Sequence, residues 1–422
     1  MPKWLVRHAW LAILAVALMA VFAFGACGDD EKKDGGAGPT DDVSEEPVFG
    51  DYGGVVVEPG QSIQIGITAV LAGDLRALGT TVRDAVALAA EDFGPVKAFP
   101  VEILPVDDGC SADPGLAAAE ILLAEDNLVA VIGSICSGVN VAVQPRYAEE
   151  NITQVSSGST AVRVTYPEGR DPFDTFVRTV VHDGVQGVEQ AKYAYEALGA
   201  KTVYSAHDTD AYGAGLKDVF NKNFEELGGQ ILGTQGWEKK QTDFGALVTA
   251  VTTAGPDLVY VASFDPEAAA FIRQLKAAGY AGKFLAGDGV ITKQFLDLAG
   301  ADAEGAFLSK PAPFDETPEL IKFKEDYKTR FGSPWDDQPY APESYDAYRA
   351  VHEALNEVAV VFGGKLYIDL ADLNDAIRGA DFDGISGHVA FDDHGDKAPQ
   401  LGKPLILFYE VKSGAYEQLV TE

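Results

Sequence analysis

Basic residues are scarce in this 422-residue sequence, which has 32 lysines and arginines against 65 aspartates and glutamates. The formal net charge of -33 argues against nucleic acid or an anionic lipid surface as a partner. Only three cysteines occur and none form a CxxC pair, which argues against a zinc ribbon or a thioredoxin-type site. Beyond the first residues, no apolar run is long enough to span a membrane. We expect no metal and no cofactor.

The first residues have the pattern of a bacterial export signal. Lys3 and Arg7 form a basic start, an apolar run covers 9–24, and Gly25 and Ala26 precede Cys27. A cysteine at the cleavage point resembles the lipobox of bacterial lipoproteins, in which that cysteine is lipidated and becomes the new N-terminus. Phe24 stands where that group usually has leucine. We predict a signal peptide over 1–26 and lipidation of Cys27; the alternative is a plain secretory signal with an incidental cysteine.

The segment that follows the signal is acidic and rich in glycine, with few apolar residues. Such a composition cannot bury enough surface to order itself, so we predict a lipidated N-terminus and flexible tether over 27–60.

Cys110 and Cys136 are the two cysteines that remain after the predicted lipidation site, and an exported chain carries them into an oxidising compartment. In an oxidising compartment, two cysteines favour one disulfide.

Short apolar runs alternate with amphipathic stretches from residue 62 onward. The first half has expected strands at 62–69, 99–108, 128–133 and 152–156, and expected helices at 78–92, 113–124 and 139–150. After residue 178 the alternation restarts, with strands at 202–206, 230–235, 257–262 and 283–288, and helices at 211–227, 243–254 and 266–278. This order predicts parallel sheets with helices on both faces. The fold class is therefore α/β, with two doubly wound units in series.

The remaining chain is expected to pack on these units rather than to form a third core. It contains predicted helices at 319–330, 343–358 and 370–377, and strand-like segments at 388–392 and 403–411. Between them, the acidic stretch DDHGD at 392–396 is compatible with a cation site or a solvated turn.

The stretch GSICSG, residues 133–138, lies where a strand ends and a helix begins. Ligands of open parallel sheets bind at such positions. Cys136 as a nucleophile would need a neighbouring base, yet no histidine has a recognisable catalytic context and the stretch does not match GxSxG. Ser137 at the helix N-terminus could instead bind an anion, aided by the hydroxyls of SSGST at 156–160. The remaining alternative is that Ser137 only caps its helix and 156–160 is an ordinary loop.

Four segments carry a resemblance to a known family: DDGCSADPGLAAAEILL (107–123), VAVIGSICSGVNVAVQP (129–145), YSAHDTDAYGAGLKDVF (204–220) and FLAGDGV (284–290). In their order and spacing, they resemble substrate-binding proteins of branched-chain amino acid ABC transporters. These are type I periplasmic binding proteins of the leucine/isoleucine/valine-binding group. The resemblance covers roughly residues 61–420.

The resemblance implies two Rossmann-like lobes joined by a three-crossover hinge that close on a ligand. Lobe 1 would comprise 61–181 plus 309–392, and lobe 2 would comprise 182–308 plus 393–422. It further implies a monomeric, extracytoplasmic, membrane-anchored lipoprotein that is not an enzyme. Its partners would be an amino acid held in the interlobe cleft and the permease subunits of an ABC transporter.

The resemblance also implies a set of site residues. The family's disulfide matches Cys110 and Cys136, its carboxylate-binding serine matches Ser137, and its carboxylate-binding loop matches Gly158 and Thr160, with Ser159 between them. Its second-lobe tyrosine matches Tyr212, a further pocket aromatic matches Phe264, and the acid that binds the ligand ammonium matches Asp288, where glutamate is commoner.

The expected side-chain pocket departs from the family pattern. Ala72-Gly73-Asp74 and then Leu78-Gly79 stand where the family often has SGP followed by an aromatic residue and glycine. Leu78 is included among the expected ligand-binding residues. Because the residues for the ligand carboxylate and ammonium match the family, the resemblance implies an amino acid, and we expect one with an aliphatic or branched-chain side chain. Two rival functions are a sensory lipoprotein that signals amino acids or amides to a receptor, and an enzyme that uses GSICSG.

Overall fold

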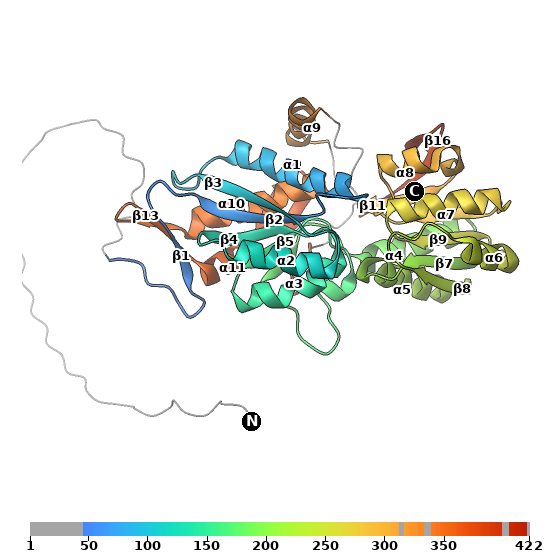
Figure 1. Cartoon of the computed structure of the whole chain (residues 1–422), viewed down its shortest axis with the longest axis horizontal. Helices are drawn as coiled ribbons and strands as arrows, with labels where there is room; N and C mark the ends of the chain where they lie inside the picture. Colours follow the sequence, from blue (N-terminus) through green and yellow to red (C-terminus); the bar gives the residue numbers. More distant parts are fainter. Residues whose placement is uncertain (1–44, 312–315, 333–338, 399–404, 420–422) are drawn as a thin grey trace, which may run out of the picture. The chain divides into compact units, whose positions relative to one another are not determined.

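The computed structural model describes residues 45–311, 316–332, 339–398 and 405–419, all within one compact unit, Val43–Glu422 (Figure 1). The predicted signal peptide, Cys27 and the tether up to residue 44 lie outside these residues. Among the described helices, none has the length and apolar character needed to cross a membrane.

A five-stranded parallel sheet forms the first part of the fold, with strand order β3-β2-β4-β5-β6. Its strands are β2 (Ile63–Ala69), β3 (Val101–Asp107), β4 (Leu128–Gly133), β5 (Thr153–Ser156) and β6 (Phe176–Arg178). The helices between them are α1 (Arg76–Phe93), α2 (Ala112–Leu123) and α3 (Ser137–Glu149), followed by the short helix η1 (Val162–Val164). All six residues of β4 are buried, which is why that strand is a continuous apolar run.

A seven-stranded sheet forms the second part, with strand order β17-β16-β11-β10-β9-β7-β8. Its parallel strands are β7 (Thr202–Asp208), β8 (Gln230–Trp237), β9 (Leu258–Ala262), β10 (Lys283–Ala286) and β11 (Phe307–Pro311). The antiparallel strands β16 (Ile406–Lys412) and β17 (Ala415–Leu419) extend it beyond β11. The accompanying helices are α4 (Asp183–Lys192), with the π-turn η2 (Tyr193–Ala197), α5 (Ala211–Glu226), α6 (Gly245–Ala254), α7 (Asp265–Ala277), α8 (Lys293–Ala299) and η3 (Gly300–Ala303).

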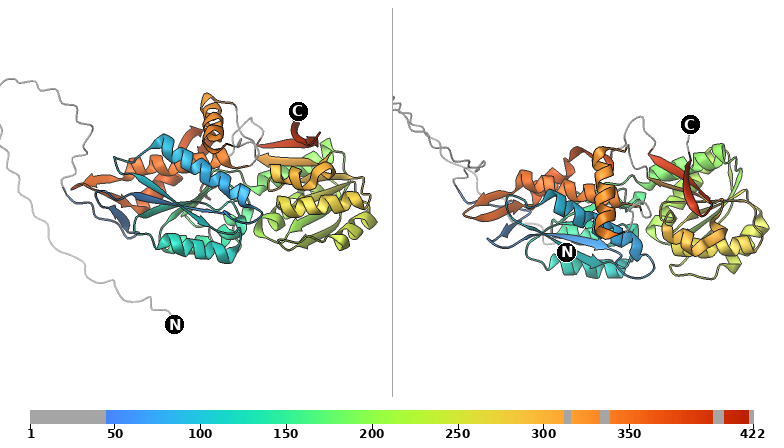
Figure 2. Two further views of the ribbon diagram at one scale, coloured as in Figure 1. Left: turned by 45° about the horizontal axis from the view of Figure 1, so that its top comes forward. Right: turned by 90° about the horizontal axis from the view of Figure 1, so that it is seen from above.

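Later segments of the chain complete the first part. Helices α9 (Pro318–Phe331) and α10 (Ala341–Val358) pack on α1, so blue α1 and orange α10 lie side by side in every view (Figures 1 and 2). Helix α11 (Leu370–Arg378) contacts α10, and β14 (Asp381–Gly384) pairs with β15 (Gly387–Ala390). The chain thus passes between the two parts after β6, after β11 and after β15. This is the doubly wound, three-crossover α/β architecture predicted from the sequence.

Two boundaries differ from the sequence predictions. Residues 54–57, placed in the flexible tether, form strand β1 (Gly54–Val57), because Val55, Val56 and Val57 supply an apolar run that pairs with β13 (Lys365–Asp369). Strand β12 (Val360–Phe362) completes that three-stranded sheet. The predicted lobe boundary at residue 309 cuts through β11, whose five residues all pair with β16.

Candidate ligand-binding site

The disulfide predicted between Cys110 and Cys136 is present, with the two Cα atoms 5.4 Å apart. It joins the loop after β3 to the loop after β4. Both half-cystines are about 1% exposed. Because the sulfur of Cys136 is bonded, it offers no thiolate, and the nucleophile alternative is wrong.

Ser137 begins α3, one residue after the disulfide. Its side chain is 1% exposed, and its Oγ accepts a hydrogen bond of 3.1 Å from the backbone N–H of Ala161. The N-cap position belongs to Cys136, and no side chain makes a capping hydrogen bond there. Ser137 therefore does not act as a helix cap. Its hydroxyl instead joins the N-terminus of α3 to the loop after β5.

That loop contains Gly158, Ser159 and Thr160. The Oγ of Ser159 and the Oγ1 of Thr160 are buried and have no hydrogen-bond partner among the described residues. A buried hydroxyl without a partner costs about 1–3 kcal/mol, so both are suited to a ligand that accepts hydrogen bonds. A Cβ at Gly158 would approach the side chain of Ile135 to 2.8 Å, which explains the glycine.

Asp288 lies in the turn after β10 and is fully buried. Its carboxylate accepts hydrogen bonds from the Tyr212 hydroxyl (2.7 Å), from Gln186 Nε2 (2.9 Å) and from the Tyr340 hydroxyl. Tyr212 comes from α5, Gln186 from α4, and Tyr340 precedes α10. Burial, together with the charge of Asp288, raises the pKa of both tyrosines well above its usual value. Both hydroxyls therefore remain protonated donors at neutral pH.

Asp183 is a second buried carboxylate, at the first position of α4. It is fully buried, and neither oxygen has a hydrogen-bond partner among the described residues. Its backbone N–H donates to the carbonyl of Thr160 at 2.7 Å, which links α4 to the hydroxyl-bearing loop. Burial, and then the negative charge of Asp288, raise the pKa of Asp183 well above its ordinary value, against smaller lowering effects of the neighbouring Thr160 hydroxyl and of the Arg178 charge. The Thr160 hydroxyl thus lies near Asp183, although the two do not form a hydrogen bond of normal geometry. A cation beside the two carboxylates would relieve this repulsion.

Two predicted apolar residues lie in the same hydrophobic cluster. Phe264 packs on Tyr212 with ring centroids 5.2 Å apart, directly before α7. Leu78, on α1, is 2% exposed and belongs to the cluster that also contains Tyr212, Phe264 and Tyr340. No group of His, Cys, Asp and Glu side chains suited to a metal ion occurs in the described parts of the chain.

The structure thus connects the residues predicted from the sequence. The hydroxyls at 137, 159 and 160 gather around the loop after β5, and Asp183 connects this loop to the helix that also presents Gln186 to Asp288. Sequence reasoning missed Asp183, Gln186 and Tyr340. Asp183 was detectable as an acid that opens a helix, but α4 itself was not predicted. No sequence motif around Tyr340 marks it as a residue of a binding site.

The model of the family described as periplasmic binding protein matches residues 62–415. The chain belongs to this family. It is 27% identical over 339 residues to "Amino acid binding protein" of Pseudomonas aeruginosa, covering 79% of this chain and 87% of that protein. It is 29% identical over 355 residues to "Leu/Ile/Val-binding protein homolog 2" of Brucella abortus, covering 82% and 90%.

A solved structure agrees with these relatives. The leucine binding protein LivK of Thermotoga maritima has a TM-score of 0.75 and 27% identity, covering 85% of this chain and 98% of that chain. The resemblance identified from the sequence and the type I periplasmic binding fold are both confirmed. The names of these relatives describe the binding of amino acids and no catalysis, and as a member of the same family this periplasmic binding protein is not an enzyme.

Proposed function

We propose that this periplasmic binding protein captures an amino acid with an aliphatic side chain and delivers it to the permease of an ABC transporter. The observation that carries the proposal is the pairing of two kinds of buried group. The buried hydroxyls of Ser159 and Thr160, which have no hydrogen-bond partner of normal geometry among the described residues, lie on the loop after β5, and the carboxylates of Asp183 and Asp288 lie beyond it. An amino acid carries one group complementary to each.

The ligand carboxylate would bind the hydroxyl side. Ser137, Ser159 and Thr160 provide hydroxyls, Gly158 allows close approach of the backbone, and α3 begins at Ser137. The first N–H groups of a helix have no intrahelical partner, and the helix dipole favours an anion near them. The neutral hydroxyl donors and the N-terminus of α3 can therefore bind a carboxylate, and no cationic side chain has to contact it.

The ligand ammonium would bind the carboxylate side. Asp288 already accepts from Tyr212, Gln186 and Tyr340, which fix its orientation. Neither oxygen of Asp183 has a hydrogen-bond partner of normal geometry within the described part of the chain, so an ammonium between the two acids would gain hydrogen bonds and lower the repulsion between them. We therefore add Asp183 to the ammonium-binding residues expected from the family resemblance.

The ligand side chain would lie against Phe264, Tyr212 and Leu78. Phe264 and Tyr212 contact each other with ring centroids 5.2 Å apart, and Leu78 is 2% exposed on α1. Buried apolar residues of this kind suit a hydrocarbon side chain better than a charged one. The names of the relatives, which refer to leucine, isoleucine and valine, support the same ligand class.

We further propose that the protein works outside the cytoplasm as a monomer anchored by lipid at Cys27. Lobe 1 would comprise 61–181 plus 312–392, and lobe 2 would comprise 182–311 plus 393–422. Genes for permease and ATPase subunits beside this gene would support the transporter over the sensory alternative.

Calorimetric titration of the wild-type protein tests the proposed ligand class. The panel comprises leucine, isoleucine, valine and alanine, with leucinamide as a matched compound that lacks the carboxylate. We expect saturable binding of at least one aliphatic amino acid and weaker binding of the amide. Folded protein that binds none of the four amino acids would refute the proposal.

A further inference from the structure

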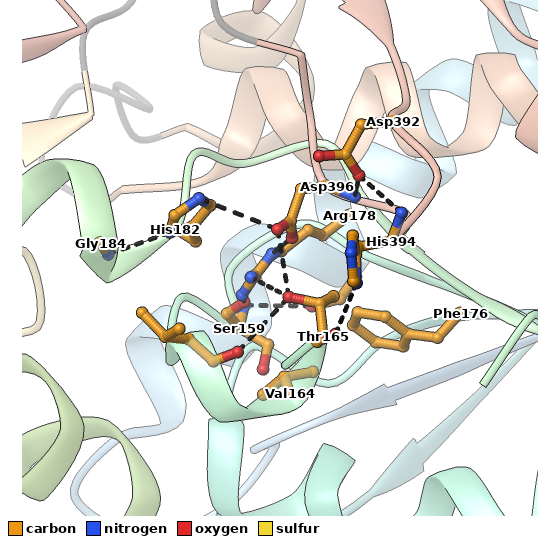
Figure 3. A network of polar contacts seen from close by, with 12 residues as sticks. Ser159, Val164, Thr165, Phe176, Arg178, His182, Gly184, Asp392, His394 and Asp396 are labelled. Carbon is orange, nitrogen blue, oxygen red and sulfur yellow. Dashed lines mark hydrogen bonds and ion pairs between the residues drawn. The ribbon is translucent and has the colours of Figure 1, made fainter. Parts of the chain in front are cut away.

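Arg178 is a fully buried arginine at the end of β6, outside the set of expected ligand-binding residues. Figure 3 shows its side chain within a cluster of polar groups drawn from distant segments of the chain. Its Nε donates to Asp396 Oδ1 at 2.5 Å, and its Nη2 donates to Thr165 Oγ1 at 2.7 Å. Thr165 in turn donates to the other oxygen of Asp396 at 3.2 Å. A buried charge is thereby paired and hydrogen-bonded.

The remaining contacts of Arg178 are with the loop proposed to bind the ligand carboxylate. Its Nη1 donates to the carbonyl of Ser159 at 2.8 Å and to the carbonyl of Ala161 at 3.0 Å. The carbonyl between them, that of Thr160, accepts from the N–H of Asp183 at 2.7 Å. All three successive carbonyls of the loop are therefore held by groups outside it.

These contacts leave the hydroxyls of the loop available. The Oγ of Ser159 and the Oγ1 of Thr160 have no partner among the described residues, although both are buried. Since Arg178 binds the backbone of the loop rather than its side chains, it fixes the direction in which those hydroxyls point. The planar guanidinium is suited to this, because its donors form a rigid fork that a lysine cannot reproduce.

Asp396 connects this arrangement to the segment between β15 and β16, one of the passages between the two sheets. The turn that presents it is closed by Asp392, whose carboxylate accepts from the backbone N–H groups of His394 and Asp396, both at 2.9 Å. The backbone N–H of Arg178 also donates to the carbonyl of Gly395 at 2.9 Å. The stretch DDHGD is therefore a turn that supports an ion pair. Its Asp392 and Asp396 carboxylates bind groups of the protein itself, which favours the turn over the cation site as the role of this stretch.

We propose that Arg178, through its buried ion pair with Asp396, is a positioning residue that holds the loop at 159–161 in the geometry for a ligand carboxylate. The residue itself does not touch the ligand. This inference rests on the proposed function, because it assumes that the loop binds a carboxylate. It predicts that Arg178 variants lose affinity selectively for ligands that carry one.

The experiment compares leucine and leucinamide binding by calorimetry in three variants. Arg178→Lys keeps the charge but loses the fork. Arg178→Met combined with Asp396→Asn removes both charges, so that no buried charge stays unpaired. The control is Arg146→Met on α3, which removes surface ion pairs with Glu120, Glu149 and Glu150 and is expected to leave both affinities unchanged.

We expect the double variant to bind leucine at least about tenfold more weakly, the loss of one good hydrogen bond to a charged group being enough for this. The leucine affinity of Arg178→Lys should fall by less, and the leucinamide affinity should change little in Arg178→Lys and in the double variant. Thermal unfolding checks that each variant is folded; if the double variant is not, Arg178→Lys alone provides the test through its leucine-to-leucinamide ratio.

Two outcomes would overturn the inference while the proposed function stands. One is a folded Arg178 variant with wild-type leucine affinity. The other is an equal loss for leucine and leucinamide, which would show that Arg178 only stabilises the fold. Absence of binding of leucine, isoleucine, valine and alanine by the folded wild type, in contrast, would refute the proposed function and this inference with it.

Discussion

Replacement of Asp288 by asparagine removes one negative charge from the site and keeps the size of the side chain. Asp288 is fully buried and accepts three hydrogen bonds, from Tyr212, Gln186 and Tyr340. An amide retains one oxygen for these donors, and its NH2 group can donate to a tyrosine hydroxyl. The main loss is therefore the ion pair with the ligand ammonium, in a place where water screens little.

Breaking a buried, hydrogen-bonded charge pair costs about 2–5 kcal/mol. Since about 1.4 kcal/mol is tenfold in affinity, the lower end of that range corresponds to about thirtyfold. Asp183 lies beside Asp288 and can retain part of the attraction, so we expect Asp288→Asn to weaken amino acid binding by at least about tenfold. Calorimetric titration with the best ligand of the wild-type panel measures this.

The matched control is Asp257→Asn, at the residue immediately before β9. Asp257 also accepts three hydrogen bonds, from the backbone N–H groups of Lys201 and Thr202 and from the Thr202 hydroxyl, but it is exposed and lies at the opposite end of the strands. This variant should lose stability and keep its affinity. If folded Asp288→Asn bound as tightly as the wild type, the assignment of Asp288 to the ammonium would be wrong.

Three further predictions concern the anchor, the disulfide and the response to pH. Cys27→Ser should abolish lipidation, so a variant that is cleaved and still partitions into detergent would contradict the anchor. Reduction of the Cys110–Cys136 bond, which links residues 26 apart, should lower the free energy of unfolding by about 3 kcal/mol in urea titrations; an unchanged midpoint would contradict this. Burial raises the pKa of Asp208 and of Asp265 to about 7. The folded state then binds more protons than the unfolded state between about pH 4 and 7, so stability should fall as pH rises through that window. Asp208→Asn combined with Asp265→Asn should flatten the fall, and a wild-type slope in this variant would count against the reasoning.

Elements with regular apolar periodicity could be predicted from the sequence. Strand β4 was identifiable because all its residues are apolar and buried on both faces. Helix α10 was identifiable because its apolar residues recur at helical spacing. Helix α4 was missed for a physical reason: its buried face includes Asp183, Gln186 and Gln190, where a core helix would have apolar side chains. A helix that breaks the apolar pattern in this way is expected at a functional site.

The site was predictable only where local motifs mark it. Ser137, Thr160 and Asp288 follow strands, and the order of the family motifs indicated each of them. Tyr340 could not be found, because it reaches Asp288 from a segment 52 residues further along the chain that has no motif of its own. From the sequence, Arg178 could be noted only as the residue after which the alternation of expected strands and helices restarts. Its role depends on Asp396, 218 residues away in the sequence.

Pairings between distant segments determine the order in which the parts of this protein can fold. Strand β1 pairs with β13, and Gly50 bonds Asp369, 319 residues away in the sequence. Strand β11 pairs with β16 near the C-terminus. A chain that ends before β13 leaves β1 without its partner β13, and one that ends before β16 leaves an edge of β11 open to other chains. Such non-local pairing slows folding. The three-stranded sheet that contains β1 and the seven-stranded sheet are therefore completed only when the C-terminal part of the chain is present, whereas the five-stranded sheet ends at Arg178. Premature termination before residue 406 should yield aggregates rather than a smaller working protein.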